Sequence, residues 1–69
     1  MPMTRAYKDI VLRLVENERG NVQDNLHRYK TAKRAGNEMH GDIVIDEAIA
    51  RHEERLAMLK AVKQEIEKD

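Results

Sequence analysis

Apolar positions recur at intervals of three and four over two long stretches of the chain, separated by a short segment that contains two glycines. This spacing places side chains on one side of an α-helix, so it predicts helices over about 4–35 and 43–68. The first stripe consists of Tyr7, Val11, Leu14, Val15, Glu18, Val22, Leu26, Tyr29 and Ala32. The second consists of Ile45, Ala48, Ile49, His52, Leu56, Leu59, Val62 and Ile66. With a loop at 36–42, the expected fold is an all-α antiparallel two-helix hairpin, a single domain over 1–69.

The ends of both predicted helices carry capping signals. Thr4 precedes the first stripe as an N-cap, and Gly36 lies where a left-handed residue ends a helix. Asp42 is placed to cap the second helix, and Asp46 and Glu47 fall in its first turn, where the helix dipole favours anions.

One glycine raises an alternative. The segment "NERGN" at 17–21 could end a first helix at Gly20, with Asn21 capping a new one, which gives three helices. The apolar stripe keeps its phase through this segment, however, and Gly20 projects to the solvent side. An exposed glycine within a helix costs only about 1 kcal/mol. The pattern therefore favours the unbroken hairpin over the three-helix alternative.

The apolar band is wider than the seam of one hairpin needs. Met3, Ala6, Ile10 and Leu12 extend it on the first helix, and Val44, Met58 and Val62 flank the stripe on the second. A chain of 69 residues has a small core, and without cysteine it has no disulfide to support it. A second copy is the simplest cover for this surface, so we expect a homodimer that forms a four-helix bundle.

Charge and hydropathy bound the environment. Charged residues make up 38% of the chain, yet the formal net charge is zero, as is typical of helices with many ion pairs. No apolar run approaches the roughly 20 residues of a membrane span, and "MPMTRAYKD" lacks a signal-peptide core. We therefore expect a cytoplasmic protein with no membrane contact.

Catalytic and metal-binding patterns are missing from the sequence. Serine and cysteine are both absent, and there is no glycine-rich phosphate loop. His27, His40 and His52 do not pair at the helical spacing that stacks metal ligands on one face. The expectation is a non-enzymatic protein with no metal and no cofactor.

Two polar residues lie within the apolar stripes. His52 is expected to be buried and hydrogen-bonded to Asn25 or Tyr29, which would fix the register of the hairpin. Glu18 is expected either to form a partly buried ion pair with Lys63 or to offer a polar contact to a partner.

The segment "HRYKTAKRAG" at 27–36 is the one nucleic-acid signal. Its cations, which could follow a phosphate backbone, are Arg28, Lys30, Lys33 and Arg34. Tyr29 falls on the apolar stripe, and cations in a last helical turn complement the dipole. A hairpin also lays beside them the acids Glu38, Asp42, Asp46, Glu47, Glu53 and Glu54. We expect these acids to neutralise much of the basic segment.

Protein recognition is the remaining class of function. Arg51, Arg55 and Met58 share one flank of the second helix, and arginine and methionine are favoured at protein interfaces. At the N-terminal end, Tyr7, Ile10 and Leu12 add apolar surface. These six residues are the candidate partner-binding positions.

In length, hairpin pattern and lack of catalytic motifs, the chain resembles small phage-encoded helical proteins that inhibit host factors, of the quorum-sensing anti-activator type. That resemblance implies a stoichiometric inhibitor of a host protein such as a transcriptional regulator. The alternative is a nucleic-acid-binding regulator that uses the basic end of the first helix, since Rop-like plasmid regulators are similar in architecture.

Overall fold

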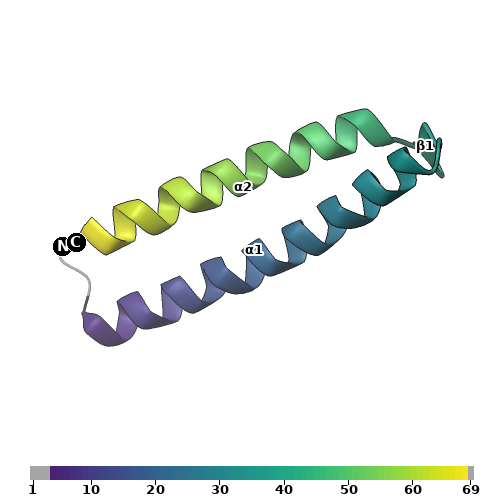
Figure 1. Ribbon diagram of the computed structural model, residues 1–69. Helices are drawn as coiled ribbons and strands as arrows, with labels where there is room; N and C mark the ends of the chain where they lie inside the picture. The colour runs from purple at the N-terminus through teal and green to yellow at the C-terminus, as the bar shows by residue number, and fades with distance from the viewer. Residues whose placement is uncertain (1–3, 69) are drawn as a thin grey trace.

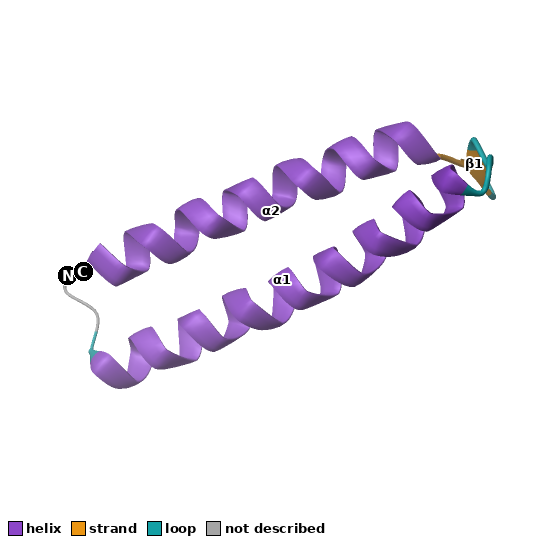
Figure 2. Ribbon diagram, viewed as in Figure 1, coloured by secondary structure: helices purple, strands orange, loops and turns teal. Residues whose placement is uncertain are grey.

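Two long antiparallel helices make up the protein (Figures 1 and 2). The computed structural model describes residues 4–68. Helix α1 runs over Arg5–Arg34 and helix α2 over Ile45–Lys68, joined by strands β1 (Met39–His40) and β2 (Ile43–Val44). The predicted helical hairpin is confirmed, with helix ends within two residues of the expected ones. Its extents of 48 × 18 × 15 Å describe a rod only two helices wide.

Helix α1 is continuous through Gly20 (Figure 1), so the three-helix alternative is wrong. A Cβ at Gly20 would meet no atom within 4 Å, which agrees with a position facing solvent. The helix begins as expected at Thr4, whose Oγ1 accepts a hydrogen bond of 3.2 Å from the Tyr7 N–H. This bond satisfies one of the amide groups that the first turn leaves without a partner.

The C-terminus of α1 closes in a Schellman motif. Gly36 has φ +90°, and its N–H donates to the Lys33 carbonyl at 3.0 Å. The Asn37 N–H donates to the Ala32 carbonyl at 3.1 Å. These two bonds are the pair that defines the motif, and the left-handed residue between them is most readily glycine. The predicted role of Gly36 is confirmed.

The link between the helices is more ordered than the expected loop. β1 and β2 pair antiparallel, with Met39 opposite Val44 and His40 opposite Ile43. Gly41 has φ +61° and, together with Asp42, forms the two-residue turn, as glycine favours in tight hairpins. Asp42 therefore does not cap α2, which begins three residues later at Ile45, and that prediction is wrong.

The core is a thin seam between the two helices. Its buried residues are Val15, Val22, Leu26, Ile45, Ala48 and Ile66. Leu14 and Val62 belong to the predicted stripes, yet their exposed fractions are 61% and 45%. A single neighbouring helix covers only a narrow sector of each surface, so the flanks of a wide stripe stay in water.

Both polar residues in the stripes have partners other than those expected. The His52 Nδ1 donates to the Ala48 carbonyl at 2.6 Å, one turn earlier in α2, and the His52 ring lies 5.3 Å from that of Tyr29. The predicted hydrogen bond to Asn25 or Tyr29 is therefore wrong, although the contact with Tyr29 is present.

The predicted pair between Glu18 and Lys63 is also wrong. Glu18 Oε1 lies 3.1 Å from the Arg55 guanidinium, and Lys63 Nζ lies 3.0 Å from Glu16 Oε1. Lys63 and Glu18 fall on different sides of the seam, because Lys63 projects toward the side that carries Glu16. Helical periodicity correctly placed Glu18 and Lys63 close to the seam, but it did not predict the side of the seam on which each side chain lies.

Candidate interaction surface

Helix α1 exposes apolar side chains along one flank near its N-terminus. Tyr7, Ile10 and Leu14 are each more than half exposed. Their spacing of three and seven residues places them on the same side of the helix. Exposed apolar side chains that form a continuous row, unlike single scattered ones, are typical of an interaction surface.

Helix α2 has a matching row. Met58 is 62% exposed and Val62 is 45% exposed, one turn apart. Both line a shallow groove whose other walls include Arg51, Arg55 and Leu59. Arg55 lies seven residues before Val62, and Arg51 lies seven before Met58, so the arginines continue the same flank toward the link between the helices.

The two rows lie on the same face of the hairpin. Glu18 is one turn after Leu14 on α1, and Arg55 is one turn before Met58 on α2. The ion pair of 3.1 Å between Glu18 and Arg55 therefore joins the two flanks across the seam. We call the surface formed by Tyr7, Ile10, Leu14, Met58 and Val62 the apolar face.

The opposite side, which we call the ion-paired face, has the reverse character. Its α1 positions recur every seven residues, as do its α2 positions, which keeps each set on one flank. They are Glu16, Gln23 and Lys30 on α1, and Asp46, Glu53, Lys60 and Glu67 on α2. Large exposed apolar side chains are concentrated away from this face.

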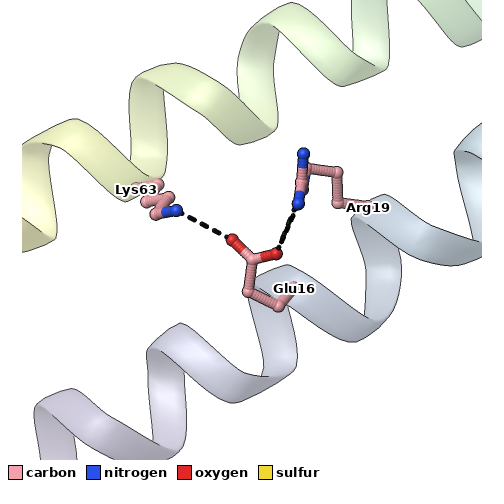
Figure 3. A network of polar contacts seen from close by, with 3 residues as sticks. All are labelled: Glu16, Arg19 and Lys63. Carbon is pink, nitrogen blue, oxygen red and sulfur yellow. Dashed lines mark hydrogen bonds and ion pairs between the residues drawn. The ribbon is translucent and has the colours of Figure 1, made fainter.

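A three-residue network joins the helices on the ion-paired face, in the half of the rod away from the link (Figure 3). Glu16 lies between Lys63 of α2, at 3.0 Å, and Arg19 of its own helix, at 2.8 Å. The ammonium group of Lys63, and then the hydrogen bonds from Arg19, stabilise the carboxylate and lower the pKa of Glu16 below its usual value. The side chain stays over a third exposed, so the network sets alignment more than it adds stability.

Two further ion pairs join the helices nearer the link. Lys30 lies 3.7 Å from Glu53, and Lys33 lies 2.7 Å from Asp46. The hydrogen bond from Lys33 to Asp46, with the charge of that carboxylate, raises the pKa of Lys33. The acidic part of α2 thus lies beside the basic segment of α1, as expected. Of the four candidate cations in that segment, Lys30 and Lys33 are paired within the molecule.

Arg28 is separated from those lysines. It lies fourteen residues after Leu14 and twenty-one after Tyr7, which places it on the flank of the apolar face. Neither Arg28 nor Arg51 forms an ion pair with any residue of 4–68. Arg34, the last of the four cations, lies one turn beyond Lys30 on the other side.

An aromatic cluster closes the link end of the hairpin. The half-buried Tyr29 ring lies 5.3 Å from the His52 ring and 5.9 Å from the His40 ring, edge to face with the latter. These contacts attach the β-hairpin to the helices. Because Tyr29 is engaged on two sides, it packs as part of the fold rather than standing free as a stacking platform.

The six candidate partner-binding residues divide between the two faces. Tyr7, Ile10 and Met58 lie on the apolar face, and Arg51 and Arg55 continue it. Leu12 is half-buried and lies one turn before Glu16, on the ion-paired face. Met3 lies outside the described residues.

Leu14 and Val62 complete the apolar face. The sequence pattern placed Leu14 in the core stripe only, and Val62 both in the stripe and among the residues that flank it. The signal that could have separated them is the width of each stripe. An apolar sector wider than one neighbouring helix can cover has members that must face elsewhere.

Neither helix contains a stretch long and apolar enough to cross a membrane. Over residues 4–68, no group of three or more histidine, aspartate or glutamate side chains is arranged to hold a metal ion. Comparison with protein-family models, with curated proteins and with solved structures finds no match to this chain.

Proposed function

We propose that this protein is a small non-enzymatic modulator that acts in the cytoplasm by binding another protein through its apolar face. In the absence of that partner, the same face joins two copies into a four-helix bundle. Binding by occupation of a surface is the mode of a stoichiometric inhibitor, for example of a transcriptional regulator, as in the phage-encoded proteins that the chain resembles. The observation that carries the proposal is the concentration of exposed apolar side chains on one face of an otherwise charged rod.

The surface area of the chain supports a missing partner. An 8.1 kDa compact monomer exposes about 4,500 Å². This hairpin exposes 5692 Å². The excess is larger than the ~800 Å² that one partner contributes to a standard interface.

The shape leads to the same conclusion. The radius of gyration is 15.4 Å, whereas a compact chain of this length has a radius of about 11 Å. A rod two helices wide buries little side-chain surface, and a second layer of helices on the apolar face would supply the core that one hairpin lacks.

Light scattering on a gel-filtration column tests the self-association. At micromolar concentration the wild-type mass is expected to be twice 8.1 kDa. The double variant Leu14→Asp with Met58→Asp is expected to elute with the mass of one chain. Gln23→Asp with Gln64→Asp introduces the same charges on the ion-paired face, where both glutamines line a groove, and is expected to remain dimeric.

Partner binding is tested with the same three proteins as immobilised baits. A partner retained by the wild type and by the glutamine control, but lost by the Leu14 and Met58 variant, supports the proposal. A wild-type chain that is monomeric and retains the same proteins as the apolar-face variant contradicts it.

The alternative function, nucleic-acid binding by the basic end of α1, makes a different prediction. RNA or heparin binding should fall steeply with salt and be lost in Lys30→Glu with Lys33→Glu. The geometry favours protein binding, because Lys30 and Lys33 are already paired with Glu53 and Asp46.

A further inference from the structure

The apolar face changes character along its length. On α1 the residues at seven-residue steps are Tyr7, Leu14, Asn21 and Arg28. On α2 the positions of Met58 and Val62 are each preceded, seven residues earlier, by an arginine. The open end of the hairpin is therefore apolar on this face. The half nearest the link carries arginines, with Glu47 and Glu54 in the grooves that Arg51 lines.

Arg28 and Arg51 lie on opposite sides of the half nearest the link, one on each helix. Each directly precedes a member of the ring pair Tyr29 and His52, whose centroids are 5.3 Å apart, so the two arginines lie at the same level. Arg28 lines one groove beside Tyr29, and Arg51 lines another beside the same tyrosine. Both arginines are exposed, and the described chain supplies neither with an ion-pair partner.

A second copy of the chain does not match this half well. In a dimer with both hairpins pointing the same way, Arg28 and Arg51 would meet the same arginines of the other copy. In the opposite orientation they would meet the apolar residues of the open end. Two acids on this face are already engaged, Glu18 with Arg55 and Glu65 with Lys68. Glu54, which lines the same groove as Arg51, forms no ion pair within the described chain but lies on the same helix as that arginine. Covering an arginine without a carboxylate leaves its charge desolvated and unpaired, which is unfavourable.

We propose that the whole face is the docking site for one amphipathic helix of another protein, with apolar side chains against the open end and glutamate or aspartate side chains against Arg28 and Arg51. This inference rests on the proposed function and specifies the chemistry of the partner. Arginine binds carboxylates through two parallel hydrogen bonds, and helix-in-groove docking uses anchors at this spacing. The helix competes with the second copy, because both cover Leu14 and Met58.

The length of the face sets the length of the partner helix. Tyr7 and Arg28 are 21 residues apart on α1, which at the helical rise is about 32 Å. A helix of about 21 residues spans this distance. Two of its three heptads would carry leucine or isoleucine toward the hairpin, and the third would carry the acids.

Synthetic peptides test the charge requirement. All share 21 residues and a leucine stripe over two heptads, with Glu, Gln or Lys at the stripe positions of the third heptad. Two series place that heptad at the N- or the C-terminal end, since the direction of the helix is open. Fluorescence anisotropy is expected to rank the affinities Glu above Gln above Lys in one of the series, with at least tenfold between Glu and Lys. Salt should weaken the Glu peptide most.

Reversing the arginines should reverse the ranking. In Arg28→Glu with Arg51→Glu, the Lys peptide is expected to bind at least tenfold more tightly than the Glu peptide. The matched control is Arg34→Glu with Lys60→Glu, which changes the same charge at exposed positions outside the apolar face and should leave the wild-type order intact. Circular dichroism of all variants shows whether each remains helical.

The outcomes separate this inference from the proposed function. Equal affinities for the Glu and Lys peptides, no binding of any peptide, or the same ranking in the arginine variant each overturn the inference. The same is true if the arginines bind RNA or heparin in preference to the Glu peptide. Loss of the dimer in the Leu14 and Met58 variant would still support the proposed function in each of those cases. A wild-type chain that binds the Glu peptide but stays monomeric would support the arginine site alone.

Discussion

The two faces of the hairpin are built on the same helices and differ in how their charges are satisfied. On the ion-paired face, Lys63 and Lys30 reach across the seam to Glu16 and Glu53. On the apolar face only Arg55 does so among residues 4–68, through Glu18. The ion-paired face exposes few large apolar side chains, whereas the apolar face exposes several, together with two arginines that form no ion pair in the described chain. The two faces therefore differ most in the apolar surface that they leave in water.

Ion pairs and apolar contacts also contribute differently to the fold, the first to the register of the helices and the second to stability. Exposed pairs contribute little free energy each, yet they act only when the helices are correctly aligned, so they select the register. Apolar contacts supply most of the stability, but a single seam provides few of them. The comparison of faces can therefore be tested by changing the seam, the apolar face, the outer edge of α1 and the ion-paired face in turn.

The largest effect is expected in the seam that both faces share. Ile45 is 1% exposed, and Ile45→Ala removes buried methyl groups at the start of α2. The expected loss is about 2–5 kcal/mol of unfolding free energy, measured by urea denaturation. Ile43→Ala, two residues earlier and exposed, is the control and should change stability by far less. Equal losses of unfolding free energy in the two variants would show that burial in the seam does not provide most of the stability.

Concentration dependence separates the two faces. If the apolar face joins two copies, the wild-type Tm rises with protein concentration, because association stabilises the folded chain. Leu14→Ala should remove about 1–2 kcal/mol of this association free energy per chain and flatten the dependence. Gln23→Ala, on the ion-paired face, should keep it. A wild-type Tm independent of concentration would exclude the dimer.

Gly20 tests the outer edge of α1, which belongs to neither face. Gly20 lies within an unbroken helix, and a methyl group at this position would meet no atom within 4 Å. Gly20→Ala should therefore raise the unfolding free energy by about 0.5–1 kcal/mol. Gly36→Ala should instead destabilise, since its φ of +90° is strained for a residue with a Cβ. Thermal denaturation of both variants checks the pair, and a destabilised Gly20→Ala would contradict a continuous helix.

The smallest effect is the pH dependence of the ion-paired face. Folding lowers the pKa of Glu16, so the carboxylate stabilises the fold above its ordinary unfolded pKa, and this contribution is lost as pH falls through the folded value. The wild-type Tm should therefore fall between neutral pH and about pH 3. Glu16→Gln should show a shallower fall, measured by circular dichroism. Glu38→Gln, a carboxylate without a described ion pair, should follow the wild type.

Local signals predicted the elements of the fold well. Thr4 and Gly36 act at the ends of α1 as capping chemistry predicts, and the phase of the stripe across Gly20 correctly indicated one helix. The β-hairpin was missed, although glycine followed by aspartate between short apolar pairs is a known turn signal. Asp42 illustrates the cost of that omission, because a residue assigned to a helix cap forms the turn instead.

Cross-helix partners were harder to predict. Glu18 and Glu16 are two residues apart, and a small change in helix rotation decides which of them faces Lys63. His52 satisfies its ring nitrogen one turn back in its own helix, so it needs no partner on α1. In each case the sequence pattern placed several possible partners within reach, and the three-dimensional arrangement of the helices determined which of them form the contact.

The sequence by itself determined two amphipathic helices, their ends to within two residues, and a connecting segment short enough to make them antiparallel, because spacing and capping act over a few residues. It also determined that the apolar band is wider than one seam. Only the tertiary structure decided which flank of each helix faces the other and that the leftover flanks meet on one face. That outcome depends on the rotation and register of the two helices, which are set by packing across the seam and by the Glu18–Arg55 and Glu16–Lys63 pairs. The same packing brought Arg28 and Arg51 to one level, where their chemistry can be tested.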